Sequence, residues 1–124
     1  MILSRNYEDI DSIFDFHEGI ISNICWNYNF TDLLMTVYYF YDIPQGLKDK
    51  DVIIRFKNCS TFNYDCGNML NSIKEFNIIT PHPEIERISL KKNNSYINVE
   101  ISTNYAAPML SLLCDEIWIE FSNE

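Results

Sequence analysis

The longest apolar segment of the chain runs over nine residues from Leu33 to Tyr41, with no Gly, Pro or charged residue inside it. Most of its side chains are β-branched or aromatic, and such side chains favour an extended strand. A strand that is apolar on both faces needs cover on both sides. The segment therefore predicts a strand in the middle of a packed sheet, away from an edge that is open to water.

Alternation of apolar and polar residues with a period of two predicts five further strands. We place them at residues 20–28, 52–57, 85–90, 96–103 and 110–121. In the first of them the apolar residues of one face are Ile20, Ile24, Trp26 and Tyr28. Ile21 falls out of phase, which indicates either a bulge or a second face that is partly covered. In the last strand the apolar positions change parity near Asp115 and Glu116, and we expect a bulge there.

Apolar residues recur at helical spacing in two places. The segment 8–15 predicts a short acidic helix or turn, whose apolar residues are Ile10, Ile13 and Phe14. The segment 69–76 predicts a short helix that ends before Pro81. Together these elements predict an α+β fold that is mostly antiparallel β. We expect about six strands and one short helix, arranged as a sandwich or a partly open barrel.

A chain of 124 residues with 47% hydrophobic and 15% aromatic residues fits one globular domain, and we expect a single domain over residues 1–124. Charged residues make up 22% of the chain, and no apolar run approaches the roughly 20 residues that span a bilayer. The first residues lack the basic and then apolar pattern of a signal peptide. These features argue against a membrane protein and predict a cytoplasmic location.

The formal net charge is −9, because 18 acidic residues oppose 9 basic ones. This charge would repel phosphates, so we do not expect the protein to bind nucleic acid. The same charge can steer a basic protein partner toward the chain, or it can serve solubility alone. Four acidic residues are the candidate partner-binding residues: Asp9, Asp11, Asp15 and Glu18. Three tyrosines could add anchors where they are exposed, although we expect them in the core: Tyr38, Tyr39 and Tyr41.

One histidine of the chain adjoins a carboxylate, because His17 directly precedes Glu18. Such a pair could act as a general base, but it needs a nucleophile or a metal partner. The other histidine, His82, lies between two prolines in a connector. We therefore expect His17 to have a structural role, and we predict no catalytic residue.

Nothing in the sequence indicates a cofactor or a metal site. The three glycines are isolated, the acidic residues lack the order of a calcium loop, and no Cys-x-x-Cys pair occurs. The four cysteines are dispersed in a chain that is large enough to fold without disulfides. We expect them to be reduced and mostly buried.

Three segments of the chain carry a resemblance to known proteins. They are Phe16–Gly19 with the following Ile21 and Ile24, then Ile54–Phe62 after the apolar strand, and finally Cys114–Glu120. On these segments the chain resembles a group of small bacterial proteins of unknown function, some of which resemble immunity proteins that sit beside polymorphic toxins. Such relatives often have His followed by Asp where this chain has His17 and Glu18. The resemblance implies binding to another protein, and it brings no catalytic residues.

We expect a non-enzymatic protein-binding module, in its most concrete form an immunity-type inhibitor of a basic toxin. Two alternatives stay open at this point. The protein could be a small-molecule-binding β-barrel or a weak hydrolase that uses His17 with Glu18, which a pocket reaching these side chains would favour. It could also be a structural homo-oligomer that pairs through strand edges.

Overall fold

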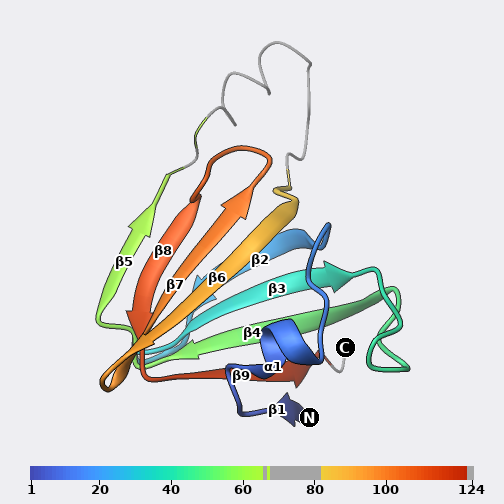
Figure 1. Ribbon diagram of the computed structural model, residues 1–124, viewed down its shortest axis with the longest axis horizontal. Helices are drawn as coiled ribbons and strands as arrows, with labels where there is room; N and C mark the ends of the chain where they lie inside the picture. The colour runs from blue at the N-terminus through green and yellow to red at the C-terminus, as the bar shows by residue number, and fades with distance from the viewer. Residues whose placement is uncertain (66, 68–81, 123–124) are drawn as a thin grey trace.

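Two antiparallel sheets dominate the regular structure, which contains almost no helix in the described residues (Figure 1). The computed structural model describes residues 1–65, 67 and 82–122. Within these residues the five-stranded sheet has the order β1 (Ile2–Ser4), β9 (Glu116–Phe121), β4 (Lys50–Lys57), β3 (Leu33–Tyr39) and β2 (Ile20–Trp26). The four-stranded sheet has the order β5 (Thr61–Tyr64), β8 (Leu110–Cys114), β7 (Tyr96–Thr103) and β6 (Ile85–Asn93). The one helix of the described residues, α1 (Asp9–Ser12), has four residues.

The two sheets are continuous through a bent pair of strands. The chain passes from β4 in one sheet to β5 in the other, and from β8 back to β9, at the same corner. Hydrogen bonds follow the bend: the Asp115 N–H donates to the Lys57 carbonyl oxygen at 2.8 Å, and the Ser60 N–H donates to the Leu113 carbonyl oxygen at 2.9 Å. The bulge expected near Asp115 is therefore wrong. The buried positions change parity there because the chain changes sheets.

A second junction, which we call the seam, joins β2 to the start of β6. The Glu18 N–H donates to the Ile85 carbonyl oxygen, and the Ile85 N–H donates to the Gly19 carbonyl oxygen, each at 2.8 Å. The Ile21 N–H donates to the Pro83 carbonyl oxygen, also at 2.8 Å. On the other side, β1 and β5 lie at the outer edges of their sheets. The sheets therefore form an open sandwich and do not close into a barrel.

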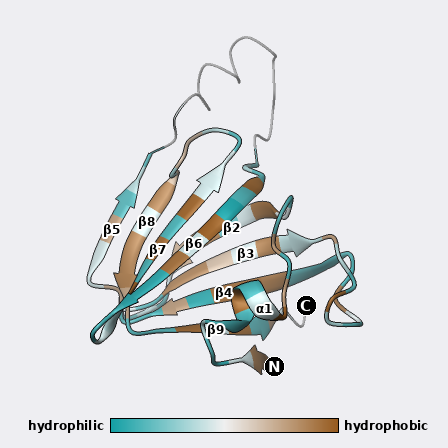
Figure 2. Ribbon diagram, viewed as in Figure 1, coloured by the Kyte–Doolittle hydropathy of each residue, from teal (hydrophilic) through white to brown (hydrophobic). Residues whose placement is uncertain are grey.

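The core lies between the two sheets and is built from alternate residues of the central strands. Figure 2 shows this as brown bands that alternate with teal or pale ones along β6 and β7. Side chains with no exposed surface are Met35, Val37, Tyr39, Val52, Ile54, Phe56, Val99, Ile101, Leu110, Cys114, Ile117 and Ile119. Strand β3 lies between β2 and β4, inside its sheet as predicted. The expected cover on its second face is wrong, because Leu34, Thr36 and Tyr38 are only half-buried.

Strand β2 contains the bulge that the sequence pattern left open. The register of β2 against β3 shifts between Ile21 and Asn23. Before the shift Ile21 lies opposite the buried Val37, whereas Ile20 lies opposite the half-buried Tyr38 on the outer face. Ile21 therefore belongs to the core, and the predicted placement of Ile20 on the same face as Ile24 is wrong, because Ile24 lies opposite the buried Met35.

Short elements account for the remaining differences from the predicted fold. The described residues form nine strands rather than about six. Strands β1 and β5 have only three and four residues, too few for a period of two to stand out. The segment 8–15 forms α1, with Ile10 and Phe14 buried and Ile13 exposed, and the predicted helix at 69–76 lies outside the described residues. No helix in residues 1–65, 67 and 82–122 is long and apolar enough to cross a membrane.

Three of the four cysteines lie in the described part of the chain, as free thiols in different surroundings. Cys114 is buried and Cys59 is half-buried, but Cys25 is exposed on the edge strand β2, so its expected burial is wrong. Burial raises the pKa of the Cys59 thiol to about 11 and that of the Cys114 thiol to about 12. Because the thiolate is the reactive form, these two thiols are weak nucleophiles at neutral pH.

In a Cys66→Ser variant, which keeps the three described thiols, we expect one thiol to react rapidly with a disulfide reagent at pH 8. A thiol with a pKa of about 11 is ionised to roughly one part in a thousand at that pH. The rapid phase should disappear when Cys25 is also replaced by Ser. Labelling of all three thiols at one rate in the folded protein would contradict this prediction.

Gly19→Ala should destabilise the protein through the seam. A Cβ atom added at Gly19 would lie 2.6 Å from the Val37 Cγ1 atom and 3.0 Å from the Phe16 carbonyl oxygen. Overpacking of this kind costs about 1–3 kcal/mol, and we expect the free energy of unfolding in urea to fall by about that amount. Ser22→Ala, at an exposed position of β2, the strand that follows Gly19, is the control. Equal stabilities of the two variants would count against this view of the seam.

Candidate functional site

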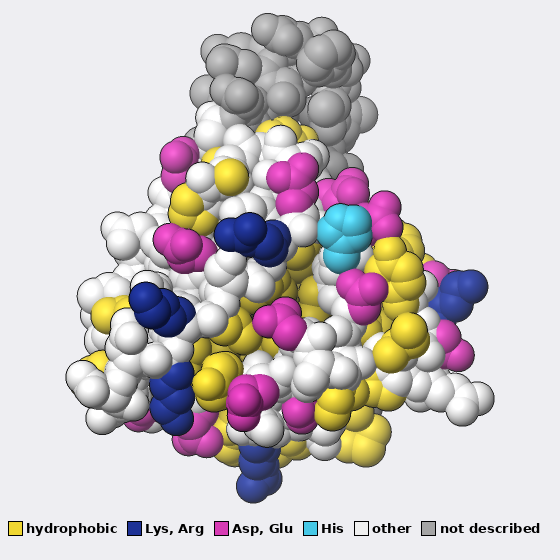
Figure 3. All heavy atoms as spheres, viewed as in Figure 1, with side chains coloured by type: hydrophobic (Ala, Val, Ile, Leu, Met, Phe, Trp, Pro, Cys, Tyr) yellow, Lys and Arg dark blue, Asp and Glu magenta, His cyan; other side chains and the backbone are white. Residues whose placement is uncertain are grey.

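Acidic side chains from two separate segments surround a hollow beside the seam. Asp11 and Asp15 line it from α1 and the residues that follow, and Glu86 and Arg87 line it from β6. The hollow has a volume of about 290 Å³. Its floor consists of the buried apolar side chains Ile10, Phe14, Phe16, Ile85 and Ile88. Figure 3 shows yellow apolar side chains at the bottom of a hollow on this face, with magenta and dark blue charged side chains around it.

The position of Asp15 is fixed by a buried tyrosine. Tyr39 is fully buried, and its hydroxyl oxygen accepts a hydrogen bond from the Asp15 N–H at 2.7 Å while it donates to the Ile43 carbonyl oxygen. Its ring packs edge-on against Phe16, with 5.2 Å between the ring centroids. Burial raises the pKa of Tyr39 above its ordinary value, so the hydroxyl keeps its proton at neutral pH. The core therefore holds the acidic segment in place.

Glu18 belongs to a second hollow at the seam. This hollow has a volume of about 270 Å³ and is lined by Glu18, Ile20, Phe40 and Glu84. The Tyr41 hydroxyl donates to Glu18 Oε1 at 2.5 Å, and this hydrogen bond raises the pKa of Tyr41 to about 12. We call the five carboxylates around the two hollows the acidic rim. Its members are Asp11, Asp15, Glu18, Glu84 and Glu86.

Three of the four candidate partner-binding residues lie in the acidic rim. The exception is Asp9, whose Oδ2 atom accepts a hydrogen bond from Ser4 Oγ at 2.6 Å and thereby braces α1 against β1. Glu84 and Glu86 are members that the sequence pattern does not reveal. They flank Ile85, the first residue of a predicted strand, but nothing local indicates that this strand begins beside β2.

His17 and Glu18 do not have the geometry of a catalytic relay. The distance between His17 Nδ1 and Glu18 Oε1 is 3.7 Å, and the two side chains are 60% and 53% exposed. A relay needs roughly 2.6–3.2 Å between these atoms, and the same Glu18 oxygen already accepts a hydrogen bond from Tyr41. A pocket does reach His17, which lines the first hollow. Among the described residues, no group of three His, Cys, Asp or Glu side chains is placed to hold a metal ion.

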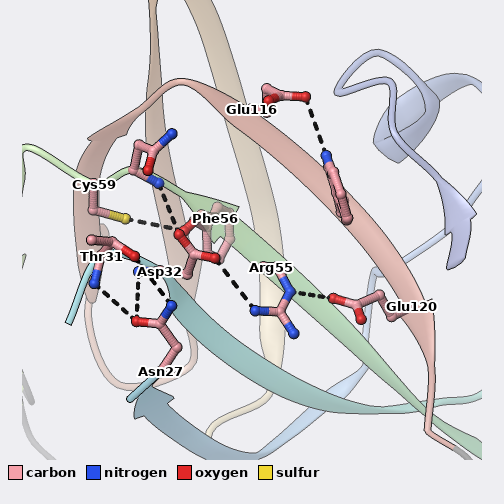
Figure 4. A network of polar contacts seen from close by, with 10 residues as sticks. Asn27, Thr31, Asp32, Arg55, Phe56, Cys59, Glu116 and Glu120 are labelled. Carbon is pink, nitrogen blue, oxygen red and sulfur yellow. Dashed lines mark hydrogen bonds and ion pairs between the residues drawn. The ribbon is translucent and has the colours of Figure 1, made fainter. Parts of the chain in front are cut away.

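A second exposed feature is the turn between β2 and β3, residues 27–32, which we call the aromatic turn. Within it Tyr28 is 96% exposed and Phe30 is 76% exposed. The Asn27 Oδ1 atom accepts hydrogen bonds from the N–H groups of Thr31 and Asp32 at 2.9 and 3.0 Å. Asn27 Nδ2 donates to Thr31 Oγ1 at 3.1 Å (Figure 4). The turn is therefore bonded internally, while its two rings face the solvent.

The aromatic turn is also tied to β4 and to the corner that follows it. The carboxylate of Asp32, which is 7% exposed, accepts hydrogen bonds from the Asn58 N–H at 3.1 Å and from Arg55 at 3.4 Å. Arg55 also donates to Glu120 at 2.5 Å, and this bond is the main cause that raises the pKa of Arg55. Figure 4 shows how Asp32, Arg55 and Glu120 form one chain of contacts. The base of the turn is thus part of the sheet.

The exposed aromatic residues are not the ones that the sequence indicates. Tyr39 lies in the core as expected, while Tyr38 and Tyr41 are half-buried. The placement of Tyr28 within a strand, on the same face as Ile24 and Trp26, is wrong, because β2 ends at Trp26 and Tyr28 is exposed. One signal for the turn is present in the sequence. Phe30 is a bulky residue in the short connection, residues 29–32, between the predicted strand 20–28 and the apolar segment that begins at Leu33, and Gly or Asn is the usual choice in such a turn.

Asn27→Ala should loosen the aromatic turn and lower the free energy of unfolding by about 1–2 kcal/mol. The variant removes the acceptor of two main-chain N–H groups, each of whose bonds contributes about 1 kcal/mol. Asn29→Ala, at an exposed position two residues away, should change stability by less than about 0.5 kcal/mol. Urea unfolding curves of both variants make the comparison, and equal effects would show that Asn27 does not hold the turn.

Comparisons with known proteins concern the fold alone. No protein-family model matches the chain, and no curated protein matches it significantly. The structure is similar to the crystal structure of an uncharacterized protein from Neisseria gonorrhoeae, with a TM-score of 0.57 at 18% sequence identity. The similarity covers 86% of this chain and 93% of that chain. The open arrangement of antiparallel strands is therefore shared with a protein of very different sequence.

Proposed function

We propose that the protein is a non-enzymatic protein-binding module that acts as an immunity-type inhibitor of a basic toxin. The acidic rim carries this proposal. Its five carboxylates come from two segments far apart in the sequence and gather around two hollows at one seam. Among the ion pairs of the described residues, none involves Asp11, Asp15 or Glu86. Their charge is therefore available to a partner.

An exposed acidic rim acts on a basic partner mainly before contact. The net charge of −9 attracts a basic protein from a distance, and the rim directs that attraction to the seam. Exposed charges are screened beyond about 8 Å at physiological ionic strength, so they affect the rate of association more than the final affinity.

The hollow that Asp11, Asp15 and Glu86 surround suits a lysine or arginine side chain from the partner. Such side chains lay their aliphatic stems on apolar surface and keep the charged head among polar groups. Arg87 lies at the same hollow, and its Nε atom donates to Ser89 Oγ on its own strand at 3.0 Å. The segments around residues 16–24, 54–62 and 114–120 resemble small bacterial proteins of unknown function, some of which resemble immunity proteins, and this supports the same kind of partner.

The test uses the purified product of the reading frame directly upstream of the gene for this chain. We expect its association rate with the protein to fall as the ionic strength rises above about 0.1 M, because the salt screens the rim. The triple variant Asp11→Asn, Asp15→Asn, Glu86→Gln should slow association about tenfold in stopped-flow fluorescence.

The matched control removes three charges from positions outside the rim. It is the triple variant Asp49→Asn, Asp51→Asn, Glu100→Gln, at exposed residues of β7, of β4 and of the loop before β4. A clearly smaller change in the association rate is expected for the control. If the association rate does not change with salt or in either triple variant, the negative charge serves solubility alone. If the two proteins do not bind, the inhibitor role is rejected for this pair.

A further inference from the structure

We propose that the aromatic turn is the anchor of the protein, and that Tyr28 and Phe30 insert into an apolar cleft with a basic margin on the partner protein. The inference rests on the proposed function and deepens it. The acidic rim explains how a partner is attracted, but carboxylates exposed to water hold a partner only weakly. The aromatic turn supplies the contact that the rim lacks.

The backbone of the aromatic turn is strained at Phe30, one of its two exposed aromatic residues. Phe30 has a φ of 60°, in the left-handed region that Gly and Asn adopt readily and bulky residues rarely do. Its side chain is 76% exposed, and neither Phe30 nor Tyr28 belongs to an aromatic pair of the described residues. The Phe30 ring therefore contributes little to the stability of its own chain. Because this backbone strain is not offset by contacts within the protein, it points to a role of Phe30 in binding another molecule.

The turn is rigid before any partner arrives. Asn27 closes it from inside, and Asp32 links it to Asn58 and Arg55 from below. A preformed loop loses little conformational entropy on binding. Most of the free energy gained by burying its rings therefore contributes to affinity. Tyrosine and other large aromatic side chains are also among the residues that most often dominate the energy of protein interfaces.

The surroundings of the turn indicate the chemistry of the surface that receives it. The rings of Tyr28 and Phe30 are exposed on the turn, so a surface that buries both of them is concave and has apolar walls. Asn58, which donates its N–H to Asp32, also donates from Nδ2 to Asp115 at 3.2 Å. The Asp115 carboxylate therefore lies beside Asn58, at the base of the turn. Its negative charge favours a basic margin on the partner's cleft. Residues 27–32 contain no Lys or Arg, which disfavours an anionic bilayer as the receptor.

The turn and the acidic rim are placed so that one partner can contact both. They lie at opposite ends of β2, which has seven residues and is therefore roughly 20 Å long. A protein interface of ordinary size covers about 800 Å² on each partner, enough to span that length. The rim then directs the approach of the partner, and the turn determines how long it stays.

The experiment measures the affinity and both rate constants for the purified product of the upstream reading frame. We expect Tyr28→Ser and Phe30→Asn each to weaken binding at least tenfold, and the double variant at least a hundredfold, through faster dissociation. The rim variant Asp11→Asn, Asp15→Asn, Glu86→Gln should instead slow association with little change in dissociation. Ile43→Ser, at an exposed apolar residue after β3, is the matched control and should bind like the unaltered protein.

Each outcome decides between the two proposals. Turn variants that bind as tightly as the unaltered protein overturn the anchor and leave the acidic rim in place. Rim variants that associate at the normal rate, with the turn variants impaired, overturn steering and support the anchor. If the upstream product does not bind at all, both proposals fall.

Two further measurements separate the anchor from other roles of the rings. Phe30→Asn should leave the thermal midpoint unchanged or raise it, because Asn adopts the left-handed conformation easily. A lower midpoint would show that the ring stabilises its own chain and would overturn the anchor. Phosphatidylcholine vesicles serve as the second probe. Binding to them that is lost in the double variant would assign the turn to a membrane and overturn the protein cleft.

Discussion

The fold depends on the hydrogen-bonded ladder that turns the corner from one sheet into the other. Antiparallel strands can bend in this way only if each main-chain donor near the bend still finds an acceptor. Here the N–H groups of Ser60 and Asp115 bond across the corner to Leu113 and Lys57. The bend lets the second sheet return over the first and enclose the core between them. It also brings β6 back to β2, where the seam and its hollows form.

The parts of the fold that follow from local pattern could be predicted closely. Strand β7 runs from Tyr96 to Thr103, as its strict alternation indicates, because one of its faces lies on the core and the other does not. The corner at Asp115 could not be predicted from the same kind of pattern. A change of parity looks alike whether one strand bulges or two strands part into different sheets. The two arrangements differ only in which strands pair with β8 and β9. Strand β9 pairs with β4, which lies far away in the sequence, whereas β8 pairs with β7 in the other sheet.

In the candidate site too, the residues that depend on local pattern could be predicted, and those that depend on distant pairing could not. The acidic residues after β1 are visible as a cluster of charge in the sequence, whereas Glu84 and Glu86 join them only through the contact between β2 and β6. Tyr28 has the parity of an inward residue, but the strand ends two residues earlier and the turn carries the ring outward. Exposure at a strand end depends on where pairing stops, which hydrophobic alternation does not encode. The acidic cluster could therefore be recognised from the sequence, whereas the exposure of Tyr28 and Phe30 could not.

The seam is held by few bonds, and this has a consequence for stability. Within the described part of the chain, three main-chain hydrogen bonds, donated by the N–H groups of Glu18, Ile21 and Ile85, join the two segments there, so this junction is a natural place for the sandwich to open locally. A partner that touches Asp15 on one wall of the hollow and Glu86 on the other binds the closed form alone. By thermodynamic linkage such a partner stabilises the closed form of the seam and thereby protects the protein from local opening and proteolysis.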